Sequence, residues 1–502
     1  MTVIAAISKV GPIICGLAVI LANSSFAVKS PRTDDVVAFE RRPYEMRLLM
    51  VFDPKSADET LRRTTVHEIQ QAADRCAGNL WSLSITEISW LSPGNKRGLE
   101  RVDRSMLVQQ HPDVTADIWF VATVESLAVG KRVSVRSWQF EVQSRTEIVS
   151  VDVMDDRDLP ITLLRLCRAL VRPMGIVEQV EEKGVRIRLR GGELDPPDPS
   201  FAQLQPGDLL IPLLAYRNRD REIEKLQVIP WTYISVKEVD GSTIRGNVES
   251  GLKLALGGKK RGRIDTLVVA VRPQFAATRI QLVTQSRPSL PLAAHRVEVR
   301  SEPIIPRVTP ENPEIDPAST LLADKLTDRR GFTEIAIIPG HPLVWLFAYS
   351  GQHLLARVPF VPGITAETRL EVPDDSTRLA AEADLQMLQG EVIDAVALRN
   401  TAMGTIRAAA NRNDWTTVNQ KLALLKQQQS STKLIERLVA VRVAGVAAAQ
   451  ANKDKTAQAR INRMCDEAVA LIKVHLADEK VRLLSEEMEA LQAPEKEPAE
   501  TQ

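Results

Sequence analysis

The hydrophobic pattern of residues 45–173 changes repeatedly between the period of two that is typical of strands and the longer period of amphipathic helices. Residues 45–52 form a short apolar run of strand length, and the next segment places Leu61, Val66 and Ile69 at helical spacing. Continued to residue 173, the pattern gives the order β-α-β-α-β-β-β-α. We therefore predict a mixed α/β sheet domain over residues 45–173, with its helices on one face of the sheet.

Residues 174–287 predict a small SH3-like β-barrel. An alternating segment near its start reads Val185, Arg186, Ile187, Arg188, Leu189 and Arg190. This alternation predicts a strand whose apolar side enters a core while its arginines face water. The tripeptide Pro206-Gly207-Asp208 favours a tight turn, because proline fixes φ and glycine tolerates positive φ. A strand should then restart at Leu209, and a later one should carry Trp231 in the core.

Residues 288–372 predict an immunoglobulin-like β-sandwich. Within it, residues 326–335 read as a hairpin in which Asp328 to Gly331 turn between two strands. Residues 343–349 and 354–360 read as two further strands around a turn at Ser350-Gly351.

Helical periodicity extends over residues 373–491, with a break at residues 411–414. We expect helical hairpins here, with residues 457–491 in one helix, and a disordered tail over residues 492–502. The segment is rich in alanine and contains one aromatic residue, Trp415. The predicted fold is therefore a multidomain α+β chain of four folded domains.

Two resemblances to known families follow from these elements. The element order of residues 45–173, followed by Gly175 and the Pro206-Gly207-Asp208 turn, resembles the α/β and small-barrel modules of periplasmic Tol-system and flagellar-ring proteins. Thr327-Asp328, then Gly331-Phe332 before an apolar strand, resembles the carboxypeptidase-regulatory and immunoglobulin-like domains of secreted bacterial multidomain proteins. Both resemblances imply binding or stabilising modules, and neither supplies catalytic residues.

The N-terminus has the pattern of a secretory signal peptide over residues 1–27. Lys9 ends a short N-terminal region and carries its positive charge, residues 10–22 are apolar, and Ser25-Phe26-Ala27 offers small residues for cleavage. Retention of this segment as an anchor is the alternative. We expect a periplasmic, envelope-associated or secreted protein.

Cysteine usage leaves the redox state open. Cys15 lies in the predicted signal, and three cysteines remain in the mature chain: Cys76, Cys167 and Cys465. Either Cys76 and Cys167 form a disulfide or all three are free thiols.

Composition excludes some classes of protein. The chain is 44% hydrophobic and 26% charged, which is typical of globular proteins and argues against general disorder. Its net charge of +1 gives no global attraction to nucleic acid. A local cationic patch is formed by Lys259, Lys260, Arg261 and Arg263. It would suit a phosphate or an acidic polymer, or would keep a hairpin tip solvated.

The sequence contains no catalytic motif that supports an enzyme. No HExxH, GxSxG or phosphate-binding glycine loop is present, and the SxxK match at residues 430–433 falls where a helix cap is expected. We expect no catalytic, metal or cofactor residues.

The leading hypothesis is a non-enzymatic scaffold or adaptor that binds a protein partner or envelope component, with self-association through the C-terminal helices as one option. The alternatives are a hydrolase with dispersed catalytic residues in the α/β domain and a polysaccharide-binding protein.

Overall fold

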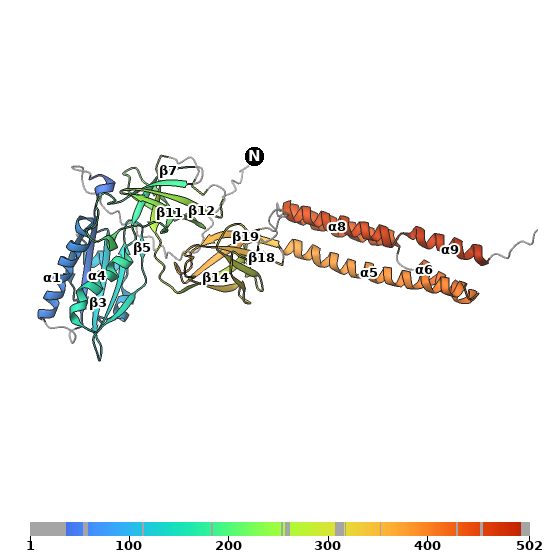
Figure 1. Cartoon of the computed structure of the whole chain (residues 1–502), viewed down its shortest axis with the longest axis horizontal. Helices are drawn as coiled ribbons and strands as arrows, with labels where there is room; N and C mark the ends of the chain where they lie inside the picture. Colours follow the sequence, from blue (N-terminus) through green and yellow to red (C-terminus); the bar gives the residue numbers. More distant parts are fainter. Residues whose placement is uncertain are drawn as a thin grey trace, which may run out of the picture. The chain divides into compact units, whose positions relative to one another are not determined.

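The computed structural model describes residues 37–492 except 54–58, 113–114, 182–183, 253–254, 257–261, 307–315, 317, 352, 428–429 and 452–454. The chain divides into two compact units, Met1–Val372 and Pro373–Gln502. The first is a mixed α/β unit that includes a closed barrel and further sheets, and the second consists of helices (Figure 1). The predicted signal peptide lies outside the described residues, as does the predicted tail beyond Gln492.

The first sheet is mixed, as predicted from the hydrophobic pattern. Its strand order is β2-β1-β3-β4-β5, with β6 also paired to β4. β1 is parallel to β2 and β3, whereas β3 and β4 are antiparallel. The strands are β1 (Tyr44–Phe52), β2 (Trp81–Glu87), β3 (Ile118–Ser126), β4 (Lys131–Gln139), β5 (Ser144–Arg145) and β6 (Val149–Val153).

Helices cover both faces of this sheet, so the prediction of one helical face is wrong. α1 (Glu59–Cys76) and α4 (Leu159–Leu170) supply Ile69 and Leu163 to the core on one face. α2 (Lys96–Arg101) and α3 (Arg104–Gln110) supply Leu99 and Leu107 to a separate core on the other face. A helix in this segment was part of the predicted element order, but hydrophobic periodicity does not determine which face of a sheet a helix covers.

Six strands close the barrel in the order β9-β11-β12-β8-β7-β13, because β13 pairs again with β9. Gly175 is required in β7 because a Cβ atom there would lie 2.7 Å from the Arg188 carbonyl oxygen. The predicted turn is confirmed: Gly207 has φ +94° and Asp208 Oδ2 accepts from the Gln205 N–H. The strands are β7 (Met174–Val180), β8 (Gly184–Leu189), β9 (Leu209–Arg217), β11 (Thr232–Asp240), β12 (Thr243–Ser250) and β13 (Ile264–Ala270), with β10 (Ile223–Val228) paired to β9 outside the ring.

Arg190 is buried, whereas the sequence predicted that all arginines of this alternating segment face water. Arg186 and Arg188 are partly exposed, as expected, but the Arg190 side chain is only 1% exposed. It forms ion pairs with Asp117 and Glu141 and donates to the Pro43 carbonyl at 2.7 Å. The barrel and the α/β sheet therefore meet across a buried ionic contact.

Seven strands form two further sheets, β17-β14-β20 and β16-β15-β18-β19, around a common apolar core. β14 lies before residue 288, where we expected this region to begin. The turn from Asp328 to Gly331 is present, with Asp328 Oδ1 accepting from Phe332 N–H, but it joins strands of different sheets. The predicted hairpin is therefore wrong. The strands are β14 (Ala277–Thr284), β15 (Arg296–Arg300), β16 (Leu321–Leu326), β17 (Phe332–Ala336), β18 (Val344–Ser350), β19 (His353–Phe360) and β20 (Glu367–Val372).

Trp231 lies in a turn rather than in the predicted strand. Its φ is +50°, and β11 begins one residue later at Thr232. The half-buried ring packs against the core of the two-sheet region, with its centroid 6.3 Å from that of Phe360. It thus contacts the neighbouring module rather than the core of its own barrel.

The C-terminal unit contains two successive helical cores that share α5 (Ser376–Ala410). The first half of α5 packs with α7 (Ser431–Ala451) and α8 (Lys455–His475). The second half packs with α6 (Trp415–Gln427) and α9 (Asp478–Gln492). The predicted break at residues 411–414 is confirmed, but the single helix expected over 457–491 is interrupted between His475 and Asp478.

Candidate functional site

The predicted cationic patch can be placed only in part. Lys259, Lys260 and Arg261 lie outside the described residues. Arg263 is exposed just before β13, and its carbonyl oxygen accepts from the Arg217 N–H at 2.9 Å. The anion-binding role of this patch remains a prediction.

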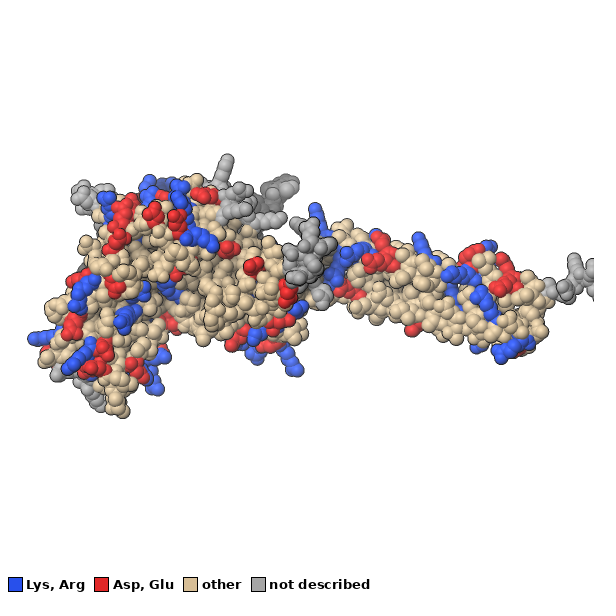
Figure 2. Space-filling view, viewed as in Figure 1, with Lys and Arg blue, Asp and Glu red and all other residues tan. Residues whose placement is uncertain are grey.

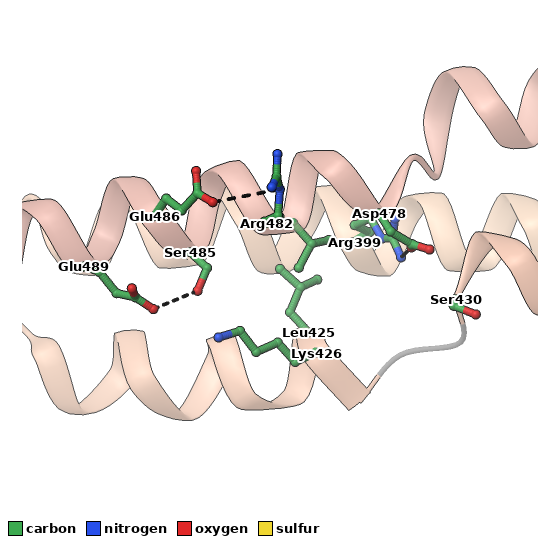
Figure 3. Close-up of a pocket in the computed structure, with 10 residues that line it drawn as sticks. Arg399, Leu425, Lys426, Ser430, Asp478, Arg482, Ser485, Glu486 and Glu489 are labelled. Atoms are coloured by element: carbon green, nitrogen blue, oxygen red, sulfur yellow. Dashed lines mark hydrogen bonds and ion pairs between the residues drawn. The ribbon is translucent and has the colours of Figure 1, made fainter.

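A hollow of about 480 Å³ opens between α5, α6 and α9 in the helical unit (Figure 3). Arg399 of α5 lies at its inner side, Lys426 of α6 lies at its rim, and α9 supplies most of the remaining polar groups. The full lining is Arg399, Leu425, Lys426, Ser430, Asp478, Val481, Arg482, Ser485, Glu486 and Glu489.

Most charges in this hollow are already paired with one another. The Arg399 side chain is 4% exposed, contacts Asp478 at 3.3 Å and donates to the Leu476 carbonyl at 2.8 Å. Arg482 lies 3.8 Å from Glu486, and Ser485 donates to Glu489. Figure 3 shows these pairs lying along the walls. The contacts hold the break between α8 and α9 against α5, which is a structural role.

Ser430 and Ser431 act at a helix start, as expected for the SxxK match. Ser430 Oγ accepts from the Lys433 N–H at 3.3 Å, which caps α7. Ser431 donates to Asp478 at 2.9 Å. The Ser430 hydroxyl therefore caps α7, and the Ser431 hydroxyl connects the first turn of α7 to the start of α9.

Aromatic side chains from the barrel and the two-sheet region are mainly packed in the interior. Trp345 is 5% exposed, and Tyr233 packs beside Val361. Burial raises the pKa of Tyr233 to about 12. These two aromatic side chains therefore contribute to packing in the interior.

The three described cysteines are free thiols. Burial raises the pKa of Cys167 to about 12 and also raises the pKa of Cys76 and of Cys465. A high pKa keeps a thiol protonated and poorly nucleophilic near neutral pH. Of the two alternatives left by the sequence, the structure therefore has the free thiols.

An exposed apolar surface of the helical unit lies on α5. Half of the large apolar side chains that are exposed in the described chain belong to this unit, including Leu379, Met387, Ile393 and Leu398 of α5. In Figure 2, tan surface predominates over α5 and charged groups are sparse there. Single exposed apolar residues are common, whereas a continuous face along one helix is typical of an interaction surface.

Beside these large side chains, a row of mostly small exposed residues follows α5 at a regular spacing, and we name this row the α5 face. Of the four large apolar side chains, only Met387 belongs to it. Nine exposed positions alternate at intervals of three and four residues, which is the heptad spacing of a helix that packs on another helix. Sequence reasoning missed the α5 face because its small residues gave a weak hydrophobic pattern, although the heptad spacing itself is visible in the sequence. The nine positions are Ala380, Ala383, Met387, Gly390, Asp394, Ala397, Thr401, Gly404 and Ala408.

Within the described residues, no helix is long and apolar enough to cross a membrane. No known protein family matches the chain. No curated protein matches it either. Among solved structures, TolB from Acinetobacter baumannii matches with 12% sequence identity and a TM-score of 0.18, over 67% of this chain and 98% of that chain. A TM-score this low supports no conclusion about fold or function.

Proposed function

We propose that this protein is a non-enzymatic scaffold or adaptor of the bacterial envelope, in which the α5 face binds a helix of a partner protein. The observation that carries this proposal is the heptad row of exposed residues on α5, in which eight of the nine positions are uncharged. Small residues at these positions let a second helix approach closely, and Met387 with its exposed apolar neighbours supplies area for burial.

Charge on and beside the α5 face indicates the chemistry of the partner. Asp394 belongs to the face, and Asp384 directly follows its member Ala383. Asp384 and Asp394 are exposed and form no ion pair with any described residue. Two copies of α5 packed in parallel register would place Asp394 against itself, which is unfavourable. A partner helix with lysine or arginine opposite these two carboxylates is therefore favoured over a second copy of this chain.

The remaining modules fit a scaffold. Seven strands in two sheets around one core support an immunoglobulin-like sandwich for β14 to β20. The signal-like pattern of residues 1–27 supports a location outside the cytoplasm. In this proposal the sheet-containing unit serves as the folded body of the protein, and the helical unit presents the binding surface.

Site-specific photo-crosslinking tests the proposal. A benzophenone amino acid replaces Met387 on the α5 face or, as a control, Gln389, which is exposed on another side of α5. We expect an adduct with one protein at position 387 and none at 389. The adduct partner is then purified and its affinity for the full chain is measured by calorimetry.

Matched charge variants test the same face. Met387→Glu with Ala397→Glu should weaken binding by at least about tenfold, because buried carboxylates would lack partners in the complex. Gln389→Glu with Asn400→Glu adds the same charge elsewhere on α5 and should leave the affinity unchanged. Equal affinities of the two double variants, with helix content unchanged by circular dichroism, would refute the assignment of the α5 face.

A further inference from the structure

A row of large side chains crosses the first sheet on the face covered by α2 and α3. Arg47 of β1 lies opposite Trp119 of β3, and Trp119 lies opposite Trp138 of β4. Trp119 and Trp138 belong to the apolar core of that face, and the Arg47 guanidinium lies over the Trp119 ring, 5.6 Å from its centroid. The register of three neighbouring strands thus brings one cation and two indoles together.

Further rings extend this row into what we call the aromatic row: Trp90, His111, Trp119 and Phe140. The ring centroids of Trp90 and His111 are 6.3 Å apart, those of His111 and Trp119 are 5.5 Å apart, and those of Trp119 and Phe140 are 5.6 Å apart. Arg104 of α3 covers the far end, with its guanidinium 4.8 Å from the Phe140 centroid. A line of aromatic rings is therefore bounded by an arginine at two places.

Four nitrogen atoms around the aromatic row are buried without a hydrogen-bond partner among the described residues: Arg47 Nε, Trp90 Nε1, His111 Nε2 and Trp138 Nε1. Trp138 is only 3% exposed. Buried polar atoms in native proteins normally have a partner, so several orphaned atoms in one cluster need an explanation. Three of the four can only donate, and His111 Nε2 donates when the ring is protonated or carries its proton there.

The local charge is also unbalanced. Arg47 and Arg104 form no ion pair with any described residue, although Arg47 donates weakly to the Thr86 hydroxyl at 3.4 Å. Burial lowers the pKa of Arg104, and burial together with the charge of Arg47 lowers the pKa of His111. A group that supplies negative charge and accepts hydrogen bonds would relieve the excess of donors and the excess of positive charge together.

We propose that the aromatic row and Arg47 form a binding site for a small organic oxyanion, either a carboxylate or a phosphate. The oxyanion accepts from Arg47 and from the unpartnered ring N–H groups of His111 and Trp90, while the indole and phenyl rings contact the apolar part of the ligand. This site is in the α/β part of the chain and is independent of the α5 face.

Titration of the full-length protein tests the site. Tryptophan fluorescence and calorimetry are recorded with inorganic phosphate, phenyl phosphate, acetate and benzoate, and with glucose as a neutral control. We expect binding of at least one oxyanion and none of glucose. Preference for the two carboxylates identifies a carboxylate ligand, and preference for the two phosphates identifies a phosphate ligand. Absence of binding by all four anions would overturn the proposal and assign the orphaned donors to water.

Two arginine variants give the test its specificity. Arg47→Gln should weaken oxyanion binding by at least about tenfold, since it removes the charge of the central donor. Arg279→Gln is the control, because Arg279 also lies over a ring, 4.4 Å from the Phe332 centroid, but outside this cluster. Equal affinities of the wild type and the Arg47→Gln variant would overturn the site, and Arg104→Gln replaces Arg47→Gln if that variant fails to fold.

The histidine provides a separate readout of contact. In the NMR titration of the His111 ring, a bound oxyanion should raise its pKa by about one unit, because negative charge stabilises the protonated ring. An anion that binds without moving this pKa occupies another site, and that result also overturns the proposal.

Discussion

Substitution of Arg190 by methionine removes a buried cation between the barrel and the α/β sheet. Its guanidinium is bonded to Asp117, to Glu141 Oε2 at 2.9 Å and to the Pro43 carbonyl, and it lies 4.7 Å from the centroid of Tyr44. Methionine keeps most of the volume, so the main effect is that two carboxylates lose their partner. Loss of one member of a buried ion pair costs about 3–5 kcal/mol of folding free energy.

The exposure of the two carboxylates sets the magnitude within this range. Asp117 is 11% and Glu141 is 24% exposed, so water partly replaces the lost contacts. We therefore expect the free energy of unfolding of the first unit to fall by about 3 kcal/mol. Arg186→Met is the matched control four residues earlier, in β8, because Arg186 is 41% exposed and lies 3.7 Å from Glu181. Its cost should stay below about 1 kcal/mol.

Urea unfolding followed by tryptophan fluorescence measures both variants. Hydrogen exchange of β1 and β7 locates the change, because Pro43 and Met174 adjoin these strands at the junction and Met174 N–H donates to Tyr44 Oη at 3.0 Å. Arg190→Met combined with Asp117→Asn should recover part of the loss, since one unpaired charge is removed. The reasoning is refuted if Arg190→Met costs no more than Arg186→Met.

Three further outcomes are expected. The mature protein should begin near Val28, and N-terminal sequencing that finds Met1 retained would favour an anchor. Trp231→Ala should cost about 2 kcal/mol, below the value for a fully buried tryptophan, and should speed hydrogen exchange in β19 next to Phe360; unchanged stability would contradict a packing role. The isolated fragment 373–491 should be marginally stable or self-associating, because many of its side chains are small and its large apolar ones are partly exposed. A cooperative, concentration-independent melt of a monomer at high temperature would contradict that expectation.

Much of the order of strands and helices could be predicted from the sequence, because turns, helix breaks and caps depend on residues that are neighbours in the chain. The turn at Gly207 and the break at residues 411–414 depend on neighbouring residues, and both occur where predicted. α1 was also predictable, because its apolar residues present one face to a core, and β1 was predictable as a compact apolar run that is buried on both faces of the sheet. The capping role of Ser430 followed from the same kind of local rule.

Only the tertiary structure determined which residues contact each face of a strand or helix. Arg186 of β8 and Arg190 just after it occupy equivalent positions of one alternating sequence, yet only Arg190 is covered, because Asp117 and Glu141 are brought to it from another module. The strands on either side of Asp328 were assigned to different sheets by pairing with distant strands. The registers of three strands bring Arg47, Trp119 and Trp138 together. Trp90, His111 and Phe140 come from segments outside these strands, and no sequence spacing relates them. Backbone periodicity fixes the direction in which a side chain points. The contribution of that side chain to the folding free energy depends on partners that are distant in sequence.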